Sequence, residues 1–396
     1  MCPEKTDNEH RPISLSEPHI HGKEWDYIKE CLDGGWVAGG DFVDRFERDI
    51  STYLGAKSAV STNSGTSALH IALKVAGVEA DDEVLVSTLT FIAPANAIRY
   101  IGAWPIFIDA EPMHWQMSID KMVHFIEEQC QWQHGELRNK TTKRRVKAIL
   151  PVHILGHPVD SDTMGEMARK YDLVVVEDAT ESLGATYRDR KVGMLGDISC
   201  FSFNGNKVIT AGGGGMIVTD NEEWGRRAKY LITQAKNDSM EYIHGEIGFN
   251  YRLSNLQAAV GCAQLEQIGE FIAAKRKIAL NYAEALEEVV GLGFMREAQW
   301  ASSICWLSTL LVDADLYGMD SRRLIDQLAQ DGIQSRPLWQ PLHLSPAHSG
   351  AQHVDCSVAE QIYEQAISLP CSVGLGQQQG RVVERLCELG QRKDEI

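Results

Sequence analysis

Residues 146–180 read VKAILPVHILGHPVDSDTMGEMARKYDLVVVEDAT, and this stretch contains the repeating unit that decides the fold. Its two ends, residues 146–155 and 173–180, are short β-branched runs of the kind found in buried strands. Residues 160–172 between them are amphipathic, with the pattern of a helix. Because two parallel strands need a long crossover connection, this strand–helix–strand pattern predicts a parallel pair.

The same alternation continues on both sides of this unit. Strand-like pieces occur within residues 97–110, AIRYIGAWPIFIDA, and within residues 214–220, GGMIVTD. The sequence therefore predicts an α/β fold with a mostly parallel sheet that helices cover on both faces. In such a sheet the active site lies at the carboxyl ends of the strands.

At 396 residues the chain is long enough for two domains, and a helical segment marks the expected boundary. Residues 254–290 have a strongly helical pattern with Ser254 as the N-cap. Such a helix would lead from a large domain with an N-terminal arm, residues 1–290, to a smaller α/β domain, residues 291–396. A polar and basic segment, residues 129–147, is predicted to be a surface excursion with a small hairpin.

The composition narrows the class of protein. Hydrophobic residues make up 44% of the chain and charged residues 23%, which is typical of a globular protein rather than a disordered one. The net charge of −17 argues against a nucleic-acid partner, which needs clustered Lys and Arg. The N-terminus is polar and the chain lacks a long apolar run, which indicates a cytoplasmic protein. The nine cysteines are scattered and include no C-x-x-C pair, which indicates reduced thiols. No metal is expected, because no His, Cys or Asp grouping has ligand spacing.

Two segments could bind an anion and a ring nitrogen. Residues 63–67, NSGTS, open a helix-like run, where free backbone N–H groups form an anion site; simple helix capping is the alternative. Asp178 ends the strand-like run VVVED. At this position a carboxylate can keep a heterocyclic nitrogen protonated through a charge-assisted bond, or it can cap the next helix.

Two further residues could act on a planar cofactor. Lys207 stands in FSFNGNKVITAGGGGM, residues 201–216, which does not resemble an exposed helix. A lysine in a partly desolvated pocket can form a Schiff base, and Gly212–Gly215 permit either a close backbone approach or a simple turn. Phe91 follows another strand-like run and could stack on a ring or pack in the core. A phosphate cradle, a ring-nitrogen partner, a lysine and a stacking platform together fit pyridoxal 5′-phosphate.

Six motifs extend this interpretation to a known family. In chain order they are NSGTSAL, FIAPANA, EDATESLGA, GDISCFSFNGNK, GGGGMIVT and GFNYRLSNLQAA. From about Trp36 to Arg336 they resemble the successive motifs of the DegT/StrS (DegT/DnrJ/EryC/StrS-type) family of nucleotide-sugar aminotransferases. The resemblance implies the aspartate-aminotransferase-like fold type I of enzymes that use pyridoxal phosphate.

Within that family, three features are most similar to enzymes of the legionaminic-acid and bacillosamine pathways. They are VEDATESLGA, the basic insertion near Arg144 and AKNDSMEYIHGEIGFNYRLSNLQAA. This similarity implies amination at C4 of a nucleotide-linked 4-keto-6-deoxy-N-acetylhexosamine.

The resemblance also implies roles for individual residues. Lys207 matches the family's Schiff-base lysine, which shuttles the proton to the substrate carbon. Asp178 matches the partner of the pyridine nitrogen, and Glu181 the residue near the phenolic oxygen, where many relatives carry Gln or His. The remaining cofactor positions match Thr66, Ser67 and Ser202 at the phosphate, Phe91 over the ring, and Asn250, which relatives contribute from the neighbouring subunit. The Asn250 match implies a homodimer with shared active sites.

The implied reaction is a ping-pong transamination in which L-glutamate donates the amino group to a keto sugar, UDP-linked by the resemblance. Lys207 favours amination, because relatives that dehydrate carry His at that position. The implied sugar contacts are Trp36, Arg252, Arg336 and His343, although Arg252 could only pin its own loop and His343 could be a satisfied surface histidine. A GDP- or dTDP-linked 4-keto-6-deoxy sugar, as in GDP-perosamine synthesis, and a non-catalytic cofactor-binding regulator remain the alternatives.

Overall fold

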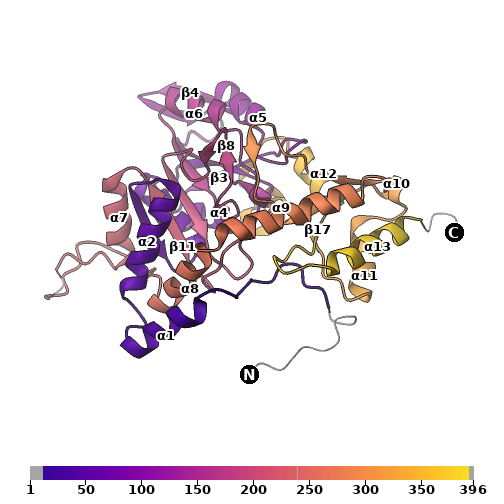
Figure 1. Cartoon of the computed structure of the whole chain (residues 1–396). Helices are drawn as coiled ribbons and strands as arrows, with labels where there is room; N and C mark the ends of the chain where they lie inside the picture. Colours follow the sequence, from indigo (N-terminus) through magenta and orange to yellow (C-terminus); the bar gives the residue numbers. More distant parts are fainter. Residues whose placement is uncertain (1–11, 239, 392–396) are drawn as a thin grey trace.

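The computed structural model describes residues 12–238 and 240–391 (Figure 1). The first eleven residues of the predicted N-terminal arm and the last five residues of the chain lie outside the described residues. No helix in the described part is long and apolar enough to cross a bilayer.

The main element is an eight-stranded sheet. In spatial order its strands are β1 (Ser58–Thr62), β11 (Gly215–Thr219), β10 (Ile198–Ser202), β7 (Val174–Asp178), β6 (Val146–Leu150), β2 (Glu83–Ser87), β3 (Trp104–Ile108) and β16 (Gln352–His353). All neighbours pair in parallel except β11, which is antiparallel to both β1 and β10. The predicted mostly parallel sheet is therefore confirmed.

The strand–helix–strand unit of residues 146–180 forms as predicted. β6 leads through a short 3₁₀ turn at Ile154–Gly156 into α6 (Ser161–Lys170), and β7 returns parallel to β6. The helix forms here because Met164 and Ala168, four residues apart, lie on one face and pack against the sheet.

Helices cover both faces of the sheet. On one face α3 (Gly65–Val75), α4 (Ala93–Tyr100) and α7 (Glu222–Ile232) share a core with alternate strand residues such as Val84, Val86 and Phe107. The residues between them, such as Leu85 and Ile106, face the opposite core. The helices of that second face are α2 (Asp41–Leu54), α5 (Ile119–His124), α6 and α8 (Asn255–Leu265).

The predicted helix of residues 254–290 is two helices. Ser254 is the N-cap of α8, as expected, and forms a capping box with Gln257. The chain breaks at Glu266, whose carboxylate accepts hydrogen bonds from the side chains of Tyr27 and Arg45, and α9 then runs over Ile268–Ala285. In Figure 1, α9 is the long orange helix that leads from the large sheet towards the C-terminal elements.

A second, four-stranded antiparallel sheet follows α9. Its order is β12 (Leu292–Phe294), β14 (Ser308–Val312), β17 (Ala366–Leu369) and β15 (Arg336–Pro337), and α10 (Ala314–Tyr317), α11 (Ser321–Gln330) and α13 (Gln378–Gln391) accompany it. β12 begins next to the predicted boundary at residue 291. However, β16 joins the large sheet, and α12 (Ser357–Gln365) packs Ala359 and Ile362 into the core of the large sheet.

Smaller elements complete the described chain. β4 (Cys130–Gln133) and β5 (Glu136–Asn139) form the hairpin predicted within the basic segment. The other helical elements are α1 (Glu24–Gly34), a π-helix at Phe125–Gln129, and 3₁₀ turns at Leu342–Leu344 and Pro346–His348. A three-stranded sheet consists of β8 (Thr186–Tyr187), β9 (Arg190–Lys191) and β13 (Ala301–Ser302).

Candidate active site

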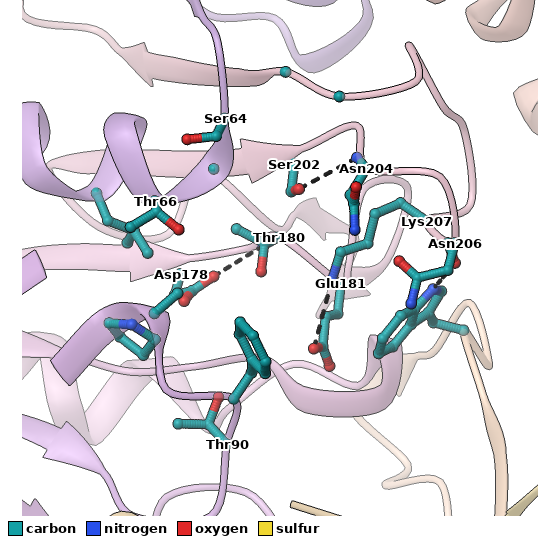
Figure 2. Close-up of a pocket in the computed structure, with 18 of the residues that line it drawn as sticks. Ser64, Thr66, Thr90, Asp178, Thr180, Glu181, Ser202, Asn204, Asn206 and Lys207 are labelled. Carbon is teal, nitrogen blue, oxygen red and sulfur yellow. Dashed lines mark hydrogen bonds and ion pairs between the residues drawn. The ribbon is translucent and has the colours of Figure 1, made fainter. Parts of the chain in front are cut away.

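A cavity of about 410 Å³ opens at the carboxyl ends of β7 and β10, beside the first turn of α3. This is the place that the sheet topology predicts for a ligand. Figure 2 shows the polar side chains that converge on it. The lining residues are Asn63, Ser64, Gly65, Thr66, Leu69, Thr90, Phe91, Ala93, Pro94, Asp178, Thr180, Glu181, Ser202, Asn204, Asn206, Lys207, Gly213, Gly214, Trp306 and Trp339.

The first turn of α3 forms one end of the cavity. Ser64 is the N-cap, and its Oγ accepts a hydrogen bond from the backbone N–H of Ser67 at 3.1 Å. The Ser67 hydroxyl is used within this turn, donating to Asn63 Oδ1 at 2.7 Å, whereas Thr66 lines the cavity. Ser64 therefore caps the helix, as the alternative interpretation of the NSGTS motif predicts. The first N–H groups of a helix have no intrahelical acceptor, so this turn also has donors that would suit an anion.

Glycines let other backbone and side chains approach this turn closely. A Cβ atom on Gly65 would lie only 2.9 Å from the Cβ atom of Ser202, which faces it from β10. A Cβ atom on Gly215 would lie 2.5 Å from the carbonyl oxygen of Ser64, and Gly214 has a left-handed φ of 115°. Both alternatives for the glycine tract therefore occur: Gly215 permits a close approach to the start of α3, and Gly212, with a φ of 71° and open space around it, lies in a bend of the chain.

Asp178 ends β7 and is almost completely buried at the cavity. One carboxylate oxygen accepts a hydrogen bond from the backbone N–H of Thr180 at 3.1 Å. Burial raises the pKa of Asp178, while the bonds from Thr180 and the charge of Lys207 oppose that rise. A buried carboxylate of this kind gains most from a cationic N–H partner placed in the cavity.

Lys207 enters the cavity from the loop after β10. Its Nζ lies 3.6 Å from Glu181 Oε1 and 4.1 Å from the ring centre of Trp306, and its side chain is only 12% exposed. The loop is held by the Trp306 indole N–H, which donates to the carbonyl of Asn206 at 2.7 Å. The lysine is thus shielded from solvent between a carboxyl group and an aromatic face.

The carboxyl group of Glu181 points into the cavity toward Lys207 (Figure 2). Burial raises its pKa to about 7, and Lys207 counteracts part of this effect. Its Oε2 accepts the backbone N–H of Leu155 at 2.9 Å. Leu155 has a left-handed φ of 58°, a conformation that costs a non-glycine residue roughly 1–2 kcal/mol. The local backbone is therefore strained at the residue that holds this carboxyl group.

The structure brings together six of the predicted site residues in one cavity: Thr66, Phe91, Asp178, Glu181, Ser202 and Lys207. This donor set fits pyridoxal phosphate. The start of α3 and Ser202 suit a phosphate group, Asp178 suits a protonated ring nitrogen, and Lys207 suits an aldehyde. The side chain of Phe91 is at the mouth, with 55% of its surface exposed, so a planar group can lie against it.

The remaining predicted residues do not line this cavity. Trp36 lines a separate cavity of about 620 Å³, and Arg252 and Arg336 are exposed, the latter donating to the carbonyl of Ser335. His343 is buried, with its ring nitrogens 2.8 Å from Thr88 Oγ1 and 2.9 Å from Glu360 Oε1. Asn250 is exposed on the loop before α8.

Two residues of the cavity, Trp306 and Trp339, were missed in the sequence. Trp306 precedes β14, and Trp339 follows β15, so both come from the part of the chain beyond α9. Residues 335–343, SRPLWQPLH, contain the predicted Arg336 and His343, and the aromatic residue between them is the signal that could have identified Trp339.

Comparison with known proteins agrees with this site. A profile of the DegT/DnrJ/EryC1/StrS aminotransferase family matches residues 18–387. The chain is 39% identical to the putative pyridoxal phosphate-dependent aminotransferase EpsN of Bacillus subtilis, over 96% of both chains. It is 36% identical to the GDP-perosamine synthase of Caulobacter vibrioides, over 92% of this chain and 94% of that one.

Solved structures give the same result. The structure superimposes on DesV from S. venezuelae, solved in complex with a ketimine intermediate, with a TM-score of 0.84 and 29% identity, over 94% of this chain and 95% of that one. The expected fold type I architecture is confirmed. The chain therefore belongs to the DegT/DnrJ/EryC1/StrS aminotransferase family and is a sugar aminotransferase that depends on pyridoxal phosphate.

Proposed function

We propose that this enzyme transfers the amino group of L-glutamate to the C4 keto carbon of a nucleotide-linked 4-keto-6-deoxy hexose. The observation that carries the proposal is the placement of Lys207 between Glu181 and Trp306, in the same cavity as the buried Asp178. A lysine, a carboxylate for the ring nitrogen and an anion cradle are what amino-group transfer through this cofactor requires.

Each group in the cavity has a part in this proposal. Thr66, Ser202 and the first turn of α3 hold the phosphate, with Ser67 bracing that turn. Phe91 covers the ring. When bound, the cofactor supplies an electron sink that stabilises negative charge on the carbon bearing the amino nitrogen. Asp178 keeps the ring nitrogen protonated, which maintains that sink, because burial makes the charge-assisted hydrogen bond strong.

Lys207 moves the proton. Its Nζ can take a proton from the donor's carbon and later return one to the sugar carbon, acting as base in one half-reaction and acid in the other. Glu181, whose Oε1 lies 3.6 Å from Lys207 Nζ and whose pKa burial raises to about 7, would hold the phenolic oxygen of a bound cofactor. The Trp306 ring excludes water from the lysine during both steps.

We further propose a homodimer with shared active sites. The segment between α7 and α8 projects from the body (Figure 1), and it exposes Met240 and Ile247 with 88% and 85% of their surfaces accessible. Such apolar exposure indicates a surface that another chain covers. Asn250 lies at the base of this segment and is exposed, so Asn250 of the partner subunit would complete the phosphate site. Trp36, Arg252 and Arg336 are exposed as well and remain proposed sugar-nucleotide contacts, with His343 bracing Thr88 beside the cavity.

Two nucleotide sugars are candidates for the amino-group acceptor. The motifs around Glu181 and the basic insertion favour a UDP-linked 4-keto-6-deoxy-N-acetylhexosamine. The similarity to GDP-perosamine synthases, at 36% and 37% identity, favours a GDP-linked 4-keto-6-deoxy sugar. The division into a large domain to residue 290 and a small domain after it belongs to the same proposal.

Absorbance of the enzyme-bound cofactor distinguishes these possibilities. L-Glutamate should abolish the visible band of the purified holoenzyme, and the correct keto sugar should restore it. Restoration by the UDP-linked sugar alone would establish the N-acetylhexosamine, and restoration by the GDP-linked sugar alone would establish the perosamine-type reaction. No loss of the band with glutamate would refute the proposed donor.

A further inference from the structure

Trp306 and Trp339 form one continuous aromatic wall of the cavity. Their rings are nearly parallel, with an angle of 8° between planes and 6.3 Å between centres, and both residues line the cavity. The two rings are stacked with an offset, and both indoles contribute to the lining of the cavity. We call Trp306 and Trp339 the tryptophan wall.

Trp306, which is the residue of the wall beside Lys207, is held in place by several hydrogen bonds. The Trp306 backbone N–H donates to the carbonyl of Leu155 at 3.0 Å, and its indole N–H donates to the carbonyl of Asn206 at 2.7 Å. Its own carbonyl accepts from Lys275 Nζ at 2.9 Å. Lys275 is 2% exposed, and its ammonium also donates to the carbonyl of Cys371 at 2.9 Å. Moving Trp306 would remove one of the two carbonyl acceptors of this buried side chain, so the position of Trp306 is well defined.

The Trp306 part of the wall lies beside Lys207. The Trp306 ring centre lies 4.1 Å from Lys207 Nζ, and the Trp339 ring centre lies 6.3 Å from that of Trp306. A substrate whose reacting carbon lies at Lys207 Nζ therefore has the rest of its first ring within contact distance of the wall.

The chemistry of the wall suits a sugar better than the amino donor. Among the described residues that line the cavity, Lys207 is the only cationic side chain, and the wall itself is uncharged. L-Glutamate carries two carboxylates, which need cationic or N–H partners. A 6-deoxy hexose carries a methyl group and ring faces rich in C–H bonds, which pack favourably on indole faces.

We propose that the tryptophan wall is the platform for the hexose ring of the nucleotide sugar, and that Trp339 is a specificity-determining residue for the sugar half-reaction. The proposal rests on the function proposed above. Trp306 contributes to both half-reactions, because it also holds the loop of Lys207 through Asn206. Among the described residues, Trp339 forms no hydrogen bond with that loop, so it contributes through the sugar.

The test compares Trp339→Leu, which keeps an apolar side chain without the aromatic face, with Trp339→Phe, which keeps a smaller face. Trp132→Leu, on the exposed hairpin strand β4, is the matched control. Calorimetry on the holoenzyme measures affinity for UDP-N-acetylglucosamine and UDP, and for GDP-mannose and GDP. Stopped-flow absorbance measures the rate constants of the two half-reactions.

For Trp339→Leu we expect the affinity for the preferred nucleotide sugar to fall about tenfold, with affinity for the matching free nucleotide within about twofold. The ratio of the sugar to the glutamate rate constant should fall by a similar factor, and Trp339→Phe should recover most of both. The Trp132→Leu variant should match the unaltered enzyme.

Three results would overturn the proposal. An equal loss of affinity for the nucleotide sugar and the free nucleotide would place the base, not the hexose, against Trp339. An equal slowing of both half-reactions would indicate only a structural role. Unchanged sugar affinity in Trp339→Leu would place the hexose elsewhere. If the unaltered enzyme reacts with glutamate but with no 4-keto sugar, the proposed function itself fails, and that outcome is visible before any variant is made.

Discussion

The two sides of the cavity are built in different ways. On the cofactor side, the first turn of α3 is joined by Asp178, Glu181, Ser202 and Lys207, which lie within thirty residues at or just after the ends of two neighbouring strands. The opposite side consists of Trp306 and Trp339, which come from segments beyond α9. Residues at the ends of buried strands supply the reactive side chains. Segments that are distant in sequence and pack against those strands supply the surface that is proposed to contact the sugar.

We expect the largest effect on activity from replacing Lys207. Lys207→Ala removes both the covalent attachment and the proton carrier, so we expect the rate constants of both half-reactions to fall by about 10⁴. Single-turnover absorbance measures this loss. Lys170→Ala, on the exposed end of α6, is the control and should leave the rates unchanged. A loss of less than tenfold in Lys207→Ala would remove this lysine from the mechanism.

Asp178→Asn tests whether the buried carboxylate supports the ring nitrogen. The change keeps the size of the side chain but removes its negative charge, so we expect kcat to fall by about 10²–10³ in both half-reactions. The cofactor spectrum should also shift. Asp326→Asn, exposed on α11, serves as the control. If the variant kept its rates and its spectrum, the ring nitrogen would have another partner.

Glu181 is expected to lower the stability of the folded protein at high pH. Its pKa in the folded protein is raised to about 7, above its value in the unfolded chain, so the folded state holds the proton more tightly. Stability from this group is complete below about pH 4.5 and declines as pH rises towards 7. Relative to the cofactor-free wild-type enzyme, Glu181→Gln should therefore gain stability over that interval, approaching about 3 kcal/mol above pH 8.

Urea unfolding of the cofactor-free protein at several pH values measures this difference. Glu287→Gln, exposed after α9, should show no such dependence on pH. A constant difference between Glu181→Gln and the unaltered protein from pH 5 to 8 would mean that the folded state does not retain the proton.

The smallest expected effect concerns the exposed segment between α7 and α8. Ile247→Glu places a charge on its apolar surface, which should weaken dimerisation by at least about tenfold, because burying that charge is unfavourable. Sedimentation velocity over a range of concentrations measures the dissociation constant. Leu316→Glu, half-exposed on α10, should leave it unchanged. Unaltered dimerisation in Ile247→Glu would place the interface on another surface.

The cofactor side could be predicted from the sequence because its signals are local. A β-branched run that ends in Asp178, and a lysine between a Phe/Ser/Asn segment and glycines, can each be recognised without knowing the rest of the fold. The hairpin of the basic segment and the cap at Ser254 were predictable for the same reason. The break at Glu266 was not, since its carboxylate is held by Tyr27 and Arg45 from other helices.

Local sequence patterns specify the alternating α/β architecture, the strand end that carries Asp178 and the loop that carries Lys207. These follow from periodicity and turn chemistry, which are properties of neighbouring residues. The family was indicated by the resemblance of the six motifs. Only the tertiary structure decided that Trp306 and Trp339 stack beside Lys207 and that His343 is held by Thr88 and Glu360. Contacts between distant segments depend on how side-chain volumes pack around one core, and no local pattern records that outcome.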